Sequence, residues 1–139
     1  MQRPPVLVCV CGLFVAAGCC IAYVAFYKWD SGNYPDKLQL ALKGSHQVIT
    51  AWDGNKLIGL MKSLADGVMN VFFLYLIVHP DYQEKGVGQK LVESMLCEYR
   101  DYARKMVIAY DEALEFFQKW GFEVGENNVP MFVTYLTNY

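Results

Sequence analysis

The residues best suited to chemistry lie in a short loop that carries two glycines and follows a long apolar stretch. The stretch Met69–Val78 leads into the loop Gln83–Gly88, and a helical pattern begins at Val87. Glycines let consecutive backbone N–H groups converge, because no Cβ atom intervenes. The amino end of a helix adds about half a positive charge at the same place. The loop therefore predicts a binding site for a phosphate or pyrophosphate group.

Two common phosphate-binding motifs do not fit this loop. Gln89 and Lys90 follow Gly88, so the Gly-Lys-Ser/Thr sequence of a P-loop is missing. Leu91 stands where a dinucleotide-binding fingerprint would have its third glycine, and the strands predicted before the loop form hairpins. A G-x-G pair at the start of a helix, taken alone, also suits an ordinary tight turn.

The elements that must hold the loop follow from the spacing of apolar residues. Met69–Val78 is apolar at nearly every position, which is typical of a central strand covered on both faces. The other predicted elements are a helix over 35–43, strands over 47–52 and 56–62 joined at Asp53-Gly54, a helix over 87–99, a strand over 105–110, a helix over 113–120, and short strands over 122–124 and 131–136. This order predicts an α/β fold, an α+β arrangement around a mixed sheet.

Composition limits the classes of protein that the chain can be. Its 139 residues and 15.9 kDa fit one domain, and 55% apolar residues are enough for a hydrophobic core. A formal net charge of −2 without a cluster of Lys and Arg argues against nucleic-acid binding. Only Cys97 lies beyond residue 20, so no disulfide framework can hold the main domain. We therefore expect a reducing, cytoplasmic environment for that domain.

The first 28 residues differ from the rest, so the sequence divides into a hydrophobic segment (1–28) and a main domain (29–139). Val6–Tyr27 is uncharged, and only two glycines among its 22 residues fall outside the apolar class. As a helix it would extend about 33 Å, enough for a hydrocarbon core of roughly 30 Å. One interpretation is therefore a membrane anchor, or membrane contact, through residues 6–27.

Three other interpretations of this segment stay open. Val6–Val10 and Leu13–Phe26 could be a strand and a helix of the fold, or the segment could be a misassigned start of the protein. It could also be a cleaved signal, because Ala16–Cys19 loosely resembles a lipobox. The four cysteines of the segment have no downstream His or Cys at ligand spacing, so we expect no metal site.

Several motifs in order resemble those of the GNAT N-acetyltransferase superfamily. Gln83-x-x-Gly86-x-Gly88 is similar to the family's Arg/Gln-x-x-Gly-x-Gly/Ala signature. Ala113–Phe122 resembles its A-x-x-F-Y-x-K-x-G-F helix, and Asp53–Gly59 resembles the turn between its second and third strands. The resemblance covers about residues 29–136.

The resemblance implies a GNAT-like acyl-CoA N-acyltransferase fold and acetyl-CoA as cosubstrate. The backbone of Leu76–Val78 would bind pantetheine, as an added strand would, and this strand would separate from the strand at 105–110. The amine of the acceptor would attack the thioester directly, and a backbone N–H near Leu76 or Ile77 would stabilise the oxyanion. The residues expected to bind the cofactor are Leu76, Ile77, Val78, Gln83, Glu84, Lys85, Gly86, Val87, Gly88, Gln89, Lys90 and Phe117.

Two positions depart from the family's pattern of catalytic residues. Phe117 stands where many members carry a tyrosine that protonates the leaving thiolate. Leu74 and Tyr75 stand where many carry a carboxylate or amide. Tyr75 and Tyr110 are therefore the candidate catalytic residues; a phenol, with an ordinary pKa of about 10, donates a proton more readily than it accepts one.

The resemblance thus predicts an N-acetyltransferase that acts on an amine acceptor. Phe117 and Leu74 motivate an alternative, a catalytically weakened acyl-CoA-binding module. The apolar run 6–27 motivates a third, a membrane-anchored interaction domain. The acceptor is not specified by these motifs, and a homodimer is an open alternative.

Overall fold

The protein forms a five-stranded mixed sheet in the order β1-β2-β3-β4-β5, over the part of the chain that is described. The computed structural model describes residues 7–11 and 33–136. Antiparallel pairing joins the first four strands, and β4 and β5 are parallel. The strands are β1 (Leu7–Cys11), β2 (Gln47–Asp53), β3 (Lys56–Ala65), β4 (Asn70–Val78) and β5 (Arg104–Val107). The α/β fold with a mixed sheet is confirmed.

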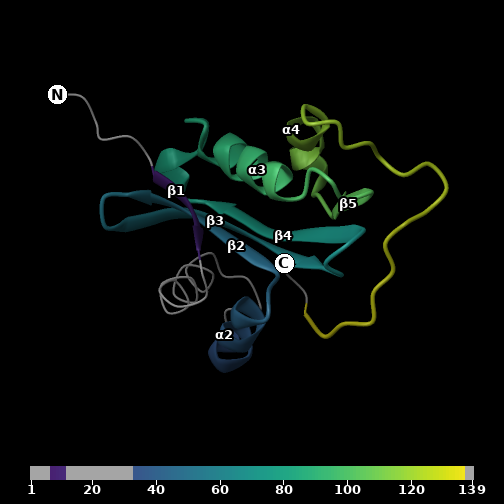
Figure 1. Ribbon diagram of the computed structural model, residues 1–139, viewed down its shortest axis with the longest axis horizontal. Helices are drawn as coiled ribbons and strands as arrows, with labels where there is room; N and C mark the ends of the chain where they lie inside the picture. The colour runs from purple at the N-terminus through teal and green to yellow at the C-terminus, as the bar shows by residue number, and fades with distance from the viewer. Residues whose placement is uncertain (1–6, 12–32, 137–139) are drawn as a thin grey trace.

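Helices lie on both sides of the sheet, with α3 and α4 on one side and α2 on the other (Figure 1). The helical elements are α2 (Pro35–Lys43), η2 (Pro80–Tyr82), α3 (Val87–Glu98), η3 (Asp111–Ala113) and α4 (Leu114–Gln118). Pro35 opens α2, where its missing N–H costs nothing. Val87, Leu91 and Met95 form the buried stripe of α3, as the apolar spacing predicts.

The main hydrophobic core lies between the sheet and α3. Side chains from all three central strands pack against Leu91, Val92 and Met95 of the helix. Gly59 of β3 allows this close packing, because a Cβ there would lie 3.0 Å from Leu91 Cδ1 and 3.2 Å from the Ile77 carbonyl oxygen. The strand residues of this core are Ile49, Ala51, Ile58, Met61, Val71 and Phe73.

One polar network is built into the edge of this core. Tyr99 is buried, and its hydroxyl lies 2.5 Å from Ser63 Oγ and 2.6 Å from His46 Nδ1. Ser63 Oγ also accepts the Gln47 N–H at 3.1 Å. Burial raises the pKa of Tyr99, and the hydrogen bond with Ser63 partly offsets that effect. The network ties the end of α3 to β2 and β3.

Replacing Tyr99 by phenylalanine should lower the free energy of unfolding by about 1–2 kcal/mol, since Ser63 loses a buried partner. Because folding raises the pKa of Tyr99, its contribution is complete below about pH 10 and is lost as the pH rises through the folded value. As the pH rises above about 10, the free energy of unfolding of Tyr99→Phe should therefore fall less than that of the wild type. Urea unfolding at pH 7 and in the alkaline range would measure both effects; equal stability of the two proteins at pH 7 would contradict the prediction.

Part of the hydrophobic N-terminal segment belongs to the sheet. The five residues of β1 pair antiparallel with β2, from Leu7↔Trp52 to Cys11↔Val48. This agrees with the strand interpretation of Val6–Val10 and contradicts a continuous helix over Val6–Tyr27, because part of that run is extended. The expected helix Leu13–Phe26 lies outside the described residues. Among the residues that are described, no helix has the length and apolar character needed to cross a bilayer.

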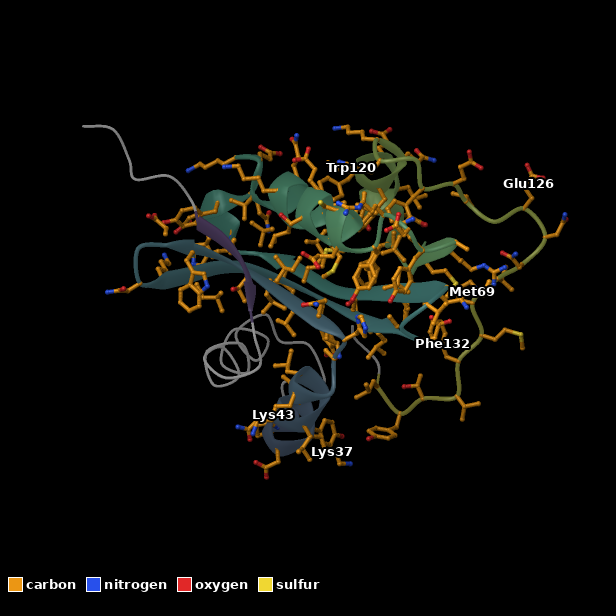
Figure 2. All side chains as sticks on the ribbon, viewed as in Figure 1. Lys37, Lys43, Met69, Trp120, Glu126 and Phe132 are labelled. Carbon is orange, nitrogen blue, oxygen red and sulfur yellow. The ribbon has the colours of Figure 1, made fainter. Side chains whose placement is uncertain are left out.

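The strands predicted over 122–124 and 131–136 are wrong. Residues 122–136 have no regular secondary structure and form the long yellow segment of Figure 1, on which Glu126 and Phe132 are labelled in Figure 2. The apolar side chains of this segment, such as Met131 and Val133, are exposed. A run of apolar residues becomes a strand only where a partner strand supplies hydrogen bonds. Near its end, Tyr135 instead contacts the Tyr34 ring beside α2, with centroids 5.9 Å apart.

Two strand boundaries also differ from the prediction. The last strand ends at Val107 instead of residue 110, and β3 continues past residue 62 to Ala65. The longer β3 follows from its pairing, because Ser63, Leu64 and Ala65 face Phe73, Phe72 and Val71 of β4. Lys62 is therefore an interior residue of a strand, not its end.

Candidate active site

The pairing of β4 with β5 ends before a bulge in β4. The parallel pairing of the two strands ends at Phe73↔Val107, so Leu76–Val78 lie beyond it. In the pairing with β3, Leu60 faces Ile77 and Lys62 faces Leu74, which leaves two β4 residues opposite one on β3. β5 therefore pairs only with Asn70–Phe73 of β4, and the separation of the two strands to admit a cofactor stays a prediction.

Tyr75 lies inside this bulge and has a left-handed backbone, with φ +54°. A non-glycine residue in that region is strained, and such strain persists where the surrounding structure holds it in place. The bulge redirects the backbone just before Leu76 and Ile77. It therefore sets the direction of the N–H groups expected to meet a thioester.

The loop after β4 is fixed at its base by three hydrogen bonds. The His79 N–H donates to the Ile58 carbonyl at 2.7 Å, and Gln83 Nε2 donates to the Val78 carbonyl at 3.2 Å. The Tyr82 hydroxyl donates to an Asp53 carboxylate oxygen. His79 Nδ1 accepts the Asp81 N–H, so this side chain caps η2. The loop is thereby held against the turn between β2 and β3.

The loop backbone turns into α3 through two left-handed residues. Glu84 has φ +60°, and Gly86, which precedes the first helical residue, has φ +83°. Nothing lies within 4 Å of the position where a Cβ on Gly86 would be. Gly86 therefore provides both the left-handed turn and open space beside the amino end of the helix.

The backbone amides at this helix end are the candidate anion-binding groups. Among the described residues, the N–H groups of Val87, Gly88 and Gln89 have no hydrogen-bond acceptor, as expected for the first turn of a helix. The Lys90 N–H donates to the Gly86 carbonyl at 3.1 Å, so it is used inside the helix. The expectation that the Lys90 amide also binds pyrophosphate is not supported by this bond.

Two lysines lie near the Tyr82 ring at the start of this loop. The ammonium groups of Lys56 and Lys85 lie 5.4 and 5.7 Å from the centroid of the Tyr82 ring. Lys56 comes from β3 and Lys85 from the loop, so two separate segments bring cations to one place. Together with the helix dipole, these charges favour an anionic ligand.

Gly88 and Phe117 serve packing in this structure. A Cβ on Gly88 would meet the Phe116 ring at 3.4 Å and Val78 Cγ2 at 3.6 Å, so Gly88 allows α4 to approach α3. Phe117 is buried in the core, with ring centroids 5.2 Å from Phe116 and 5.6 Å from Phe122. The two glycines of the loop thus have different roles.

The two candidate phenols stand in different surroundings. Tyr75 is half-buried and its ring faces the Lys62 ammonium, with Nζ 4.9 Å from the centroid. Tyr110 is 58% exposed and directly precedes η3, outside the last strand. Tyr75 therefore stands at the strand bulge, whereas Tyr110 stands on the connection from β5 to α4.

Sequence reasoning missed Lys62. It is 4% exposed, and among the described residues no carboxylate lies at ion-pair distance from it. Burial lowers the pKa of its amine. Burying an unpaired charge costs several kcal/mol of folding free energy, even after the surrounding structure relaxes. The burial of Lys62 therefore calls for an explanation. The signal in the sequence was a single lysine inside the run Ile58–Ala65, which the prediction had ended at residue 62.

Comparison with known proteins agrees with this geometry. A family model described as acetyltransferase (GNAT) domain matches residues 44–124. The chain belongs to the GNAT family. It is 29% identical over 115 residues to "GCN5-related N-acetyltransferase 2, chloroplastic" of Arabidopsis thaliana, an alignment that covers 67% of this chain and 45% of the relative. The chain spans about half the length of the curated relatives it matches.

Solved GNAT structures share the fold. A GNAT family acetyltransferase from Streptococcus pneumoniae superposes with a TM-score of 0.82 at 21% identity, covering 94% of this chain and 99% of the other. A predicted acetyltransferase from Clostridium acetobutylicum, solved with acetyl-CoA, gives a TM-score of 0.76 at 10% identity and covers 91% and 96% of the two chains. GNAT proteins use acetyl-CoA. Within the described residues there is no cluster of metal-ligating side chains.

Proposed function

We propose that this GNAT protein is an acetyl-CoA-dependent N-acetyltransferase that acts on an amine. The observation that carries the proposal is the left-handed turn at Gly86, which leaves open space beside the amides of Val87–Gln89, for which the described part of the chain supplies no acceptor. That arrangement fits a pyrophosphate, and the cations of Lys56 and Lys85 add the matching charge.

In this proposal each part of the site has a separate task. The helix amides hold the diphosphate, and the backbone of Leu76–Val78, which lies beyond the β4–β5 pairing, binds the pantetheine arm as an added strand. The bulge at Tyr75 directs an N–H of Leu76 or Ile77 toward the thioester carbonyl, where it stabilises negative charge. Acetyl-CoA supplies the activated acetyl group, which the acceptor amine attacks directly. The Tyr75 hydroxyl is the proposed proton donor to the leaving thiolate.

Isothermal calorimetry of the full chain with acetyl-CoA and with desulfo-CoA tests the binding part directly. We expect saturable binding of both, because the diphosphate is common to them. Binding of neither ligand at millimolar concentration would reject the proposal. Transfer is then measured by thiol release with a panel of simple amines, including benzylamine, spermidine and a lysine-containing peptide.

A second candidate function is a module that binds acyl-CoA without transferring the acyl group. The observation in its favour is Phe117, which has no proton to give and is packed among Phe116 and Phe122. A protein of this kind would bind acetyl-CoA normally and release no thiol with any amine of the panel.

Replacing Phe117 by tyrosine separates the two functions. If the protein is an enzyme weakened by the missing phenol, the variant should release thiol about tenfold faster, since a positioned acid contributes up to about 10²–10⁴-fold. A binding module would show no gain. Phe116→Tyr is the matched control, because it adds a hydroxyl to the neighbouring ring. Equal gains in both variants would contradict a specific role for position 117.

A further inference from the structure

The amine of Lys62 is a buried titratable group to which the proposed function gives no task. Because side chains alternate along a strand, Lys62 projects from the face opposite to that of Met61, which packs in the core beneath α3. Its Nζ lies 4.9 Å from the centroid of the Tyr75 ring. This contact joins Lys62 to the strained residue of the β4 bulge.

The strands around Lys62 give it no counter-charge. Asp53 is the only acidic residue of β2, β3 and β4, and it accepts the hydroxyl of Tyr82. Lys56, the only other basic residue of these strands, lies near the Tyr82 ring at the loop. Tyr75 is the titratable side chain found in contact with Lys62 among the described residues. Loss of hydration lowers the pKa of the Lys62 amine and increases its neutral fraction near pH 7.

Lys62 also stands beside the place where transfer is proposed. It faces Leu74 across the β3–β4 pairing, and the bulge that follows leads directly into Leu76 and Ile77. The neutral form of an amine at this point can take a proton. Transfer to an amine requires such a group, because an ordinary aliphatic amine is protonated at pH 7 and an ammonium nitrogen has no lone pair to attack with.

We propose that Lys62 is the general base that deprotonates the acceptor. The inference rests on the proposed acetyl transfer and names a catalytic residue for it. The acceptor ammonium gives one proton to the Lys62 amine, and its nitrogen then forms a bond with the acetyl carbon. The carbon–sulfur bond breaks, the Tyr75 hydroxyl gives its proton to the thiolate, and the Tyr75 oxygen takes the second proton that the nitrogen loses. The products are an amide, a thiol and the Lys62 ammonium, which releases its proton to water.

Ionisation of Lys62 can be measured without any acceptor. In the full chain labelled with ¹³C-lysine, NMR titration follows each lysine, and Lys62→Met identifies the Lys62 signal by its loss. We expect the Lys62 midpoint to lie below those of surface lysines such as Lys43, which stands at the end of α2 (Figure 2). A midpoint within the range of the surface lysines would overturn the proposal.

Stability gives a second readout that does not depend on activity. Between the lowered pKa of Lys62 and 10.5, the unfolded chain binds more protons than the native protein, so this residue makes wild-type stability rise with pH. Lys62→Met removes the cost of burying this amine and should raise the melting temperature by several degrees at pH 7, with a smaller gain at pH 10. A lower melting temperature would assign Lys62 a structural role.

The decisive comparison is the pH profile of acetyl transfer to whichever panel amine the wild type acetylates. Lys62→Met and Lys62→Arg should lower kcat/KM at pH 7 by about 10²–10⁴-fold and leave acetyl-CoA binding unchanged. The loss should shrink at high pH, where the acceptor is already neutral, whereas Lys43→Met should match the wild type. If Lys62→Met transfers acetyl as fast as the wild type, Lys62 is not the general base, and the proposed acetyl transfer itself is unaffected. A wild type that binds acetyl-CoA and acetylates no amine refutes the transfer itself.

Discussion

Replacing Gly86 by glutamate should weaken acetyl-CoA binding at least 100-fold, a loss of about 2.7 kcal/mol or more in binding free energy. The backbone at this residue is left-handed, with φ +83°, and the space where its Cβ would stand is open. A glutamate would strain that turn and bring a negative charge to the amides that are proposed to hold the diphosphate. Calorimetry with acetyl-CoA measures the effect.

Gly67→Glu is the matched control for this variant. Gly67 has φ +87° and equally open surroundings, but it lies in the turn between β3 and β4, outside the proposed site. The two variants should therefore lose similar stability, while only Gly86→Glu loses the cofactor. Unchanged affinity in Gly86→Glu would contradict the assignment of the loop.

Replacing Gly59 by valine should lower the free energy of unfolding by about 2–3 kcal/mol and weaken acetyl-CoA binding as well. A Cβ on Gly59 would stand 3.0 Å from Leu91 Cδ1 and 3.2 Å from both Val87 Cγ1 and the Ile77 carbonyl oxygen. A branched side chain must therefore push α3 away from the sheet. The movement would separate the amides at the start of α3 from the strand that is proposed to bind pantetheine.

Gly44→Ala provides the comparison, measured by urea unfolding and calorimetry. Gly44 ends α2 with an ordinary helical backbone, and a Cβ there would meet the Leu40 carbonyl oxygen at 3.3 Å. We expect a small change in stability and no change in affinity from this variant. If Gly59→Val bound acetyl-CoA as the wild type does, close packing of α3 would not be needed for the site.

Local pattern was sufficient to predict the elements that hold the cofactor loop. The stripe of Val87, Leu91 and Met95 specifies α3, and the largely apolar run Met69–Val78 specifies the central strand. Gly86, just before α3, and Gly88, in its first turn, mark the turn into the helix. These are properties of neighbouring residues, so they are readable without knowledge of distant contacts.

The same reasoning from local pattern failed at the end of the chain. Met131–Leu136 is apolar at every position except Thr134, but a strand exists only where a second strand accepts its hydrogen bonds, and none is paired with it in the described sheet. The apolar N-terminal run was ambiguous for a similar reason. Its apolar composition fits both a helix in lipid and a strand in a sheet. The pairing of β1 with β2 shows that residues 7–11 form a strand.

The sequence by itself therefore determined the family, the order of the main elements and the glycine turn, because each depends on short-range order along the chain. Only the tertiary structure distinguished Gly86, which faces open space, from Gly88, which faces Phe116. It also placed Lys62 against Tyr75 in a site without a carboxylate among the described residues. Burial and counter-charge depend on which strands pair and in what register, and no local pattern encodes that pairing.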